Sequence, residues 1–158
     1  MRIEWIGALL VVGCGILWGW QRNRKEEGRL RQVEAWIALL RQTRGRVEGM
    51  ALPMREILGR TEESLLKACG FEEDGTPSTF SELLSACRIE DRETEGVLME
   101  FASGFGRGYR EEEVRACDHY LRALEERREF LSSRLSGRKR LNTTLSLTGS
   151  LAVVLLLL

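Results

Sequence analysis

The sequence has few prolines and histidines, and it has no excess of charge of either sign. Its 158 residues include two prolines and one histidine, and 24 Lys and Arg are balanced by 24 Asp and Glu. Nucleic-acid affinity depends on an excess of basic side chains that neutralises phosphates, so no nucleic-acid partner is expected. Both prolines, Pro53 and Pro77, are expected to mark the first turns of helices.

Cysteine and histidine are too sparse and too scattered for a metal site. Cys14, Cys69, Cys87 and Cys117 lie far apart without a C-x-x-C pair, and His119 is the single histidine. A structural zinc site needs four such ligands at short spacings. A separation of two residues also points Cys117 and His119 to different faces of a helix, which argues against a thiol–imidazole pair. We therefore expect no metal and no cofactor, and we interpret the three later cysteines as buried thiols in a reducing compartment.

Patterns typical of enzymes are missing as well. Gly104, Gly106 and Gly108 form a G-x-G-x-G string, but no strand precedes it and no Lys-Ser/Thr follows, so the context of a phosphate loop is absent. We interpret the string as a tight turn between two helices. The many carboxylates alternate with arginines, which is typical of solvated helix faces. We therefore predict no enzymatic activity and no small-molecule substrate.

Two uncharged apolar stretches, residues 5–20 and 141–158, flank a highly charged segment. A helix needs roughly 20 mostly apolar residues to cross a bilayer, with about 17 at the short end. We therefore predict a transmembrane helix at residues 1–20, one domain at residues 21–140 and a second transmembrane helix at residues 141–158.

Small residues in the predicted spans favour close helix packing. Gly15 and Gly19 form a G-x-x-x-G pattern in the first span, and Ser146, Gly149 and Ser150 form a small face in the second. Small side chains let membrane helices approach closely. They are consistent either with packing of the two spans on each other or with docking onto the spans of a partner.

Basic residues indicate the orientation of the predicted spans. One cluster begins at Arg22 after the first span, and another ends at Arg140 before the second. Positive charge next to a span marks the cytoplasmic side, so the central segment is predicted to be cytoplasmic and both termini to lie across the membrane. An alternative is a lipoprotein, because residues 11–14 resemble a lipobox ending at Cys14. The apolar continuation after Cys14 and the basic cluster that follows oppose this alternative.

The central segment shows helical periodicity and no sustained alternation, so we predict an all-α bundle of about five to six helices. The first helix precedes Pro53, and a second is expected from Pro53 to Gly70. Ser78 is expected to cap a short third helix, and another short helix follows the polar run at residues 90–95. The predicted inward positions of the first helix are Leu30, Val33, Ile37, Leu40 and Val47. Those of the last helix are Val114, Cys117, Leu121, Leu124, Leu131 and Leu135.

Several short motifs, taken in order, resemble the stage III sporulation protein AB family of endospore-forming bacteria. The opening has Ile6-Gly7-Ala8, Gly19 and Leu30-Arg31-Gln32, and the end runs from Arg140-Leu141 through Leu145 and Gly149. Val47 and Glu56-Ile57-Leu58 fit the family's E-I-x-Y-G-x-x-P-L-x-E-A-L stretch, where Arg46, Gly49 and Met50 depart from it. Phe101 and Phe105-Gly106 fit F-G-x-x-L-G, whereas Gly108, Tyr109 and Glu113 replace the polar positions of S-D-x-x-x-Q.

The resemblance implies a non-enzymatic component of an envelope-spanning complex between mother cell and forespore. It implies a cytoplasmic helical domain similar to that of the type II secretion platform protein. The implied partners are a cytoplasmic ATPase, the stage III sporulation protein AA, and other membrane proteins of the complex. The implied location is the mother-cell membrane around the forespore. The alternative from a different class is a generic membrane-anchored helical adaptor or scaffold.

Two polar connections are the candidate docking sites for such a partner, because loops on a rigid scaffold commonly carry contacts. They are the loop at residues 72–76 and the turn that contains Arg107, Tyr109 and Arg110. Tyr and Arg are favoured as interface anchors, so Tyr109 and Arg110 are the strongest candidates. The competing interpretation is that Tyr109 only packs over Phe105.

Overall fold

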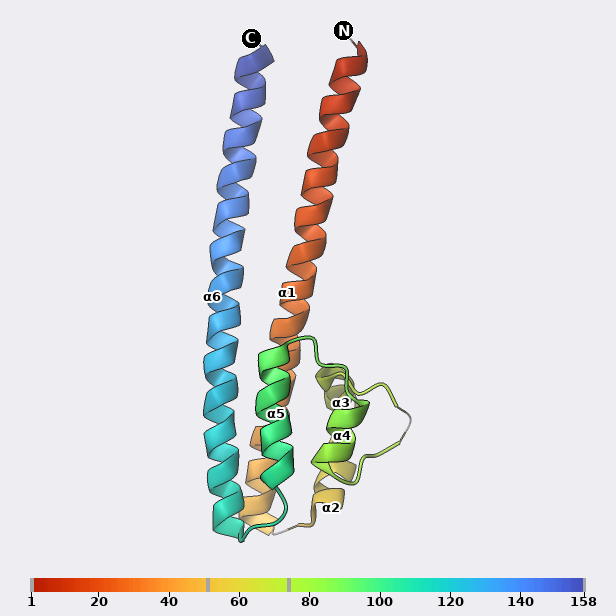
Figure 1. The fold of residues 1–158 in the computed structure, drawn as a ribbon, viewed down its shortest axis with the longest axis vertical. Helices are drawn as coiled ribbons and strands as arrows, with labels where there is room; N and C mark the ends of the chain where they lie inside the picture. The colour runs from red at the N-terminus through yellow and green to blue at the C-terminus, as the bar shows by residue number, and fades with distance from the viewer. Residues whose placement is uncertain (1, 51, 74, 158) are drawn as a thin grey trace. The chain divides into compact units, whose positions relative to one another are not determined.

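The computed structural model describes the backbone of residues 2–50, 52–73 and 75–157, and the side chains of residues 24–49, 52–73 and 75–137. Within these ranges the chain forms six α-helices and no strand, which confirms the predicted all-α class (Figure 1). The helices are α1 Arg2–Met50, α2 Met54–Gly59, α3 Glu63–Cys69, α4 Phe80–Ala86, α5 Arg92–Gly104 and α6 Arg110–Leu157. An isolated antiparallel bridge joins Phe71 to Cys87.

The chain divides into two compact units. Unit 1 comprises residues 1–28 and 131–158, and unit 2 comprises residues 29–130. In the described part of the chain, no helix combines the length and the apolar character needed to cross a membrane. The predicted spans at residues 5–20 and 141–158, with Gly15, Gly19, Ser146, Gly149 and Ser150, lie outside the residues whose side chains the structure describes. The membrane spans therefore stay predictions.

The core of unit 2 is built around α1. Val33, Ile37, Leu40 and Val47 are buried as predicted, and Leu30 is half-buried. The buried surface is wider than one stripe and also includes Ala35, Trp36, Leu39 and Thr43. The reason is that other elements cover α1 on more than one side. It forms ion pairs with α6 through Arg41 and Arg44, and its Gln32 and Arg46 side chains bind the segments that lead into and out of α3.

The helix predicted from Pro53 to Gly70 is two helices, α2 and α3, so that prediction was wrong in its middle. Side chains donate hydrogen bonds to the backbone carbonyl oxygens at the end of α2 and just after it. Arg46 donates to Ile57 O and, at 2.8 Å, to Arg60 O, while Thr61 Oγ1 donates to Ile57 O at 2.9 Å. In a continuous helix these carbonyl oxygens would accept hydrogen bonds from backbone amides four residues later. Here side-chain donors take the place of those amides. Gly70 ends α3 with φ of 101°, as its predicted role as a helix stop requires.

The starts of the two short helices α4 and α5 differ from the predicted positions. Thr79, rather than Ser78, caps α4, because its Oγ1 accepts a hydrogen bond from Glu82 N at 3.1 Å. Ser78 N instead donates to the Glu82 carboxylate at 2.7 Å. The next helix, α5, begins inside the polar run, where Asp91 caps it by accepting from Thr94 N at 3.0 Å. In α6, Cys117, Leu121, Leu124 and Leu131 are buried as predicted, whereas Val114 and Leu135 are only half-buried.

Candidate interaction surface at the turn between α5 and α6

The glycine string forms the tight turn between α5 and α6, as predicted. Gly106 has φ of 90°, a conformation that glycine adopts without steric cost. At Gly108 an added Cβ would lie 2.9 Å from Glu112 Oε2, the end of a flexible side chain that accepts a hydrogen bond from Tyr109 N. Gly106 therefore has a conformational reason to be glycine, and a side chain at Gly108 would require Glu112 to move.

Two carboxylates from the first turns of α6 hold the backbone of this turn. Glu113 Oε1 accepts from Gly106 N at 2.9 Å and from Gly108 N at 2.8 Å, and its Oε2 lies 3.0 Å from Gly106 N. Glu112 Oε2 accepts from Tyr109 N at 3.1 Å. The side chain of Glu113 is almost fully buried. Internal carboxylates thus occupy the amide groups that an external phosphate would need.

Aromatic packing fixes the other end of the turn. The Phe105 ring lies 4.5 Å from that of Phe101 and 5.7 Å from that of Phe80, between ring centroids. Phe101 in turn meets Tyr120 of α6 edge-on at 5.4 Å. These rings tie the turn to the core through α4, α5 and α6, so the turn has the rigid support that a binding surface needs.

The structure distinguishes the three predicted contact residues. Tyr109 is 84% exposed, so the alternative that it packs over Phe105 is wrong. Arg107 is also exposed. The guanidinium of Arg110 is engaged, because its Nη2 donates to the carbonyl oxygen of Glu48 near the end of α1. Arg110 is also exposed, and it caps the end of α1 through this hydrogen bond. Whether these residues contact a partner stays a prediction.

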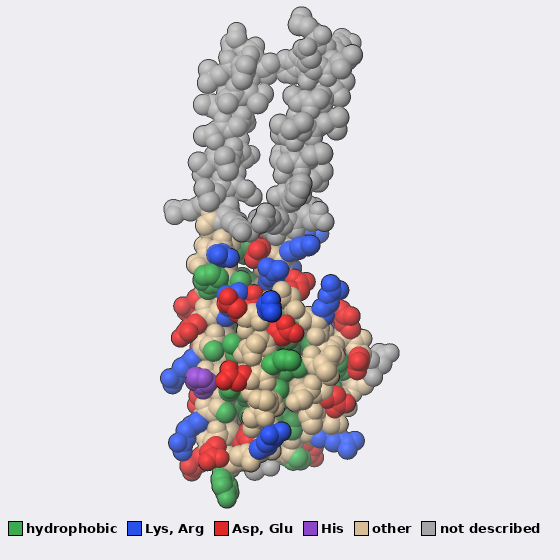
Figure 2. All heavy atoms as spheres, in the orientation of Figure 1, with side chains coloured by type: hydrophobic (Ala, Val, Ile, Leu, Met, Phe, Trp, Pro, Cys, Tyr) green, Lys and Arg blue, Asp and Glu red, His purple; other side chains and the backbone are tan. Residues whose placement is uncertain are grey.

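The second predicted candidate, the loop between α3 and α4, lies apart from this turn in Figure 1. Glu72, Glu73 and Thr76 are exposed there, and Asp74 lies outside the described residues. The two candidates therefore do not form one surface. The visible face of unit 2 carries acidic and basic side chains side by side, without a large region of one sign (Figure 2).

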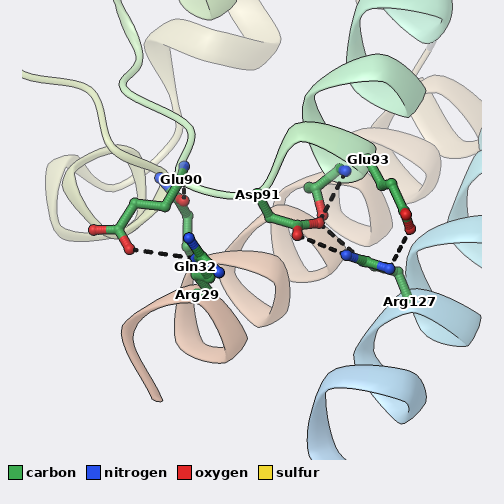
Figure 3. Close-up of polar contacts among 7 residues, drawn as sticks. Arg29, Gln32, Glu90, Asp91, Glu93 and Arg127 are labelled. Carbon is green, nitrogen blue, oxygen red and sulfur yellow. Dashed lines mark hydrogen bonds and ion pairs between the residues drawn. The ribbon is translucent and has the colours of Figure 1, made fainter. Parts of the chain in front are cut away.

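A buried ion pair between α5 and α6 escaped the sequence analysis. Arg127 donates from Nη2 to Asp91 Oδ1 at 2.7 Å and from Nε to Oδ2 at 2.9 Å (Figure 3). The side chains of Asp91 and Arg127 are 7% and 17% exposed. Thr94 donates to the same carboxylate through Oγ1 at 2.6 Å, and Arg127 also reaches the exposed Glu93. The sequence offers a signal for Asp91 as an N-cap, because Asp is favoured at a helix start, but it offers none for the pairing with Arg127.

The electrostatics of this pair follow from its surroundings. Burial by itself raises the pKa of the Asp91 carboxyl, but the hydrogen bonds from Arg127 and Thr94 outweigh it and lower that pKa to about 2. The carboxylate is therefore charged at all physiological pH values, and the pair behaves as a permanent link between the start of α5 and the middle of α6.

The side chain of Gln32, on α1, also binds the segment that precedes α5. Its Nε2 donates to Cys69 O at 3.0 Å and to Arg88 O at 2.7 Å, and its Oε1 accepts from Glu90 N at 3.1 Å. Figure 3 shows Gln32 and Arg127 approaching the segment before α5 from two different helices. This polar network links α1, α6 and the segment at residues 88–91, so it has a structural role.

Metal and thiol chemistry find no support in the described side chains, where no group of three or more His, Cys, Asp or Glu could hold a metal ion. Cys69, Cys87 and Cys117 are free thiols. Burial raises the pKa of Cys69, and it raises the pKa of both Cys87 and Cys117 to about 12. These thiols are therefore protonated and weakly nucleophilic at neutral pH.

The described part of the chain is thus an all-α protein with a rigid turn that exposes one tyrosine. The family model of stage III sporulation protein AB matches residues 4–71, which span α1 to α3 and confirm the resemblance over that part. The match covers less than half of the chain. No curated protein and no solved structure matches the chain. The turn between α5 and α6 lies beyond the matched residues.

Proposed function

We propose that the chain is a non-enzymatic membrane platform of the sporulation complex that links mother cell and forespore. The family match over residues 4–71 is the observation that carries the proposal. The platform would dock a cytoplasmic ATPase, the stage III sporulation protein AA, and would assemble with other membrane proteins of that complex. Its helical domain would then play the part of the cytoplasmic domain of a type II secretion platform protein.

The proposed membrane anchors are the apolar stretches at residues 5–20 and 141–158. The backbone is helical through residue 20 in α1 and from residue 141 to Leu157 in α6. A helix pairs its backbone amide and carbonyl groups internally, and a bilayer core requires this because it offers these groups no hydrogen-bond partners. The basic clusters that begin at Arg22 and end at Arg140 favour a cytoplasmic position for unit 2. In a sporulating cell, this membrane would be the mother-cell membrane around the forespore.

The proposed docking site is the turn between α5 and α6, with Tyr109 as its anchor and Arg107 beside it. Interface energy concentrates in a few anchors, and Tyr is among the favoured residue types. Tyr109 is exposed and its supporting backbone is hydrogen-bonded, so little ordering is needed when a partner binds. Arg110 contributes by fixing the turn to Glu48 of α1 rather than by contact with the partner.

Tyr109→Ala is expected to weaken ATPase binding about 30-fold, because the loss of an interface anchor costs about 2 kcal/mol. The measurement is a titration of the purified ATPase against the full chain in detergent. Met99→Ala is the matched control, since Met99 is another large exposed side chain, at 60%, but lies on α5 away from the turn. Full binding by a folded Tyr109→Ala variant would remove this site, and no binding by the wild type would contradict the platform proposal.

A further inference from the structure

The turn that exposes Tyr109 has unusually strong internal support for so short a connection. Gly104 ends α5, and Gly106 and Gly108 lie in the turn itself; glycines cost more conformational entropy to order than other residues. A glycine-rich connection of this kind would sample many conformations without additional restraints. The restraint comes mainly from one side chain, Glu113, which binds the amides of both Gly106 and Gly108.

We propose that Glu113 is a positioning residue for Tyr109, an inference that rests on the proposed docking function. Its carboxylate spans the turn and fixes the backbone on both sides of Arg107, immediately before Tyr109. Hydrogen bonds from amides to a charged carboxylate are about twice as strong as those between neutral groups. Because Glu113 is only 8% exposed, water competes weakly for these bonds. The backbone that carries Tyr109 is therefore held in place before the partner arrives.

The neighbouring glutamates have different roles, which makes the inference specific. Glu112 binds only Tyr109 N, at 3.1 Å. Glu111 pairs with Arg115, one helical turn later, and its side chain is 87% exposed. Removal of Glu111 therefore deletes the same charge from the same helix start and leaves the amides of Gly106 and Gly108 bound. It is the matched control for Glu113.

Glu113→Ala is expected to free the turn and weaken ATPase binding about ten-fold, since the partner must then order at least one further backbone residue. Hydrogen exchange of the Gly106 and Gly108 amides in the full chain is expected to become faster. Glu111→Ala is expected to change neither quantity. Glu113→Gln keeps an acceptor for both amides, and its affinity is expected to lie closer to that of the wild type than to that of Glu113→Ala.

The two readouts separate this inference from the proposed function. Unchanged exchange of the two amides in Glu113→Ala would overturn the positioning role, whatever the partner. Faster exchange with the same affinity as Glu111→Ala would also overturn it, because flexibility would then not affect docking. If the wild type does not bind the ATPase, the proposed function fails, and the role of Glu113 in docking fails with it, while the exchange data still report on the turn itself. Faster exchange together with weaker binding supports the inference.

Discussion

Leu124→Asp is expected to unfold unit 2. The Leu124 side chain is fully buried in α6, at 0% exposure. An unpaired carboxylate at such a position costs several kcal/mol, and a domain of this size has a total stability of roughly 5–15 kcal/mol. Leu121→Asp is expected to act in the same direction with a smaller effect, because Leu121 retains 7% exposure. Thermal melting followed by circular dichroism measures both.

The control for these variants is Arg122→Asp, which places the same carboxylate on the exposed side of the same helical turn. It is expected to melt close to the wild type, because surface substitutions away from specific contacts have small effects. Melting of Leu124→Asp at the wild-type temperature would show that α6 does not bury this face.

The second large effect is expected for Arg127→Met. It removes the partner of the buried Asp91 and leaves an uncompensated carboxylate, which costs about 3 kcal/mol or more. Glu93→Gln is the matched control, because Glu93 also pairs with Arg127 but is 72% exposed, and exposed pairs contribute little. Urea unfolding of the three proteins gives the free energies. Equal stability of Arg127→Met and Glu93→Gln would contradict the assigned role of the pair.

The same pair predicts a pH dependence. The folded-state pKa of Asp91, about 2, lies below its ordinary value of 3.8. The stabilisation is therefore complete above about pH 4 and is lost as the pH falls toward 2. Arg127→Met is expected to lose this part of the acid sensitivity. Asp91→Asn/Arg127→Met is expected to be more stable than Arg127→Met alone, because no uncompensated charge is then left at residue 91.

Helical periodicity in the sequence predicted which faces of the long helices are buried. The inward faces of α1 and α6 were recovered because Val33, Ile37, Leu121 and Leu124 recur at helical spacing. The break between α2 and α3 was not recovered, because it depends on Arg46, a side chain from another helix that binds the end of α2. A contact of that kind leaves no periodic signal in the segment that it interrupts.

The candidate site was predicted only in part, again because contacts between helices leave no signal in the local sequence. The glycine string marked the turn, and the exposure of Tyr109 follows from its position at the end of that turn. The role of Arg110 and the pairing of Arg127 with Asp91 depend on long-range contacts between helices. In the sequence, Arg127 is one of many charges on a mixed-charge face, and only the arrangement of α5 against α6 distinguishes it from its neighbours.

The most direct test of the account is the membrane topology of the chain. The variant Thr76→Cys places a thiol in an exposed loop of unit 2, and Arg2→Cys places one before the first predicted span. In protoplasts of an expressing host, a membrane-impermeant thiol reagent is expected to label Arg2→Cys above the wild-type background. Thr76→Cys is expected to stay unlabelled until the membrane is permeabilised. Ready labelling of Thr76→Cys in intact protoplasts would contradict a cytoplasmic domain, and with it the platform that docks a cytoplasmic ATPase.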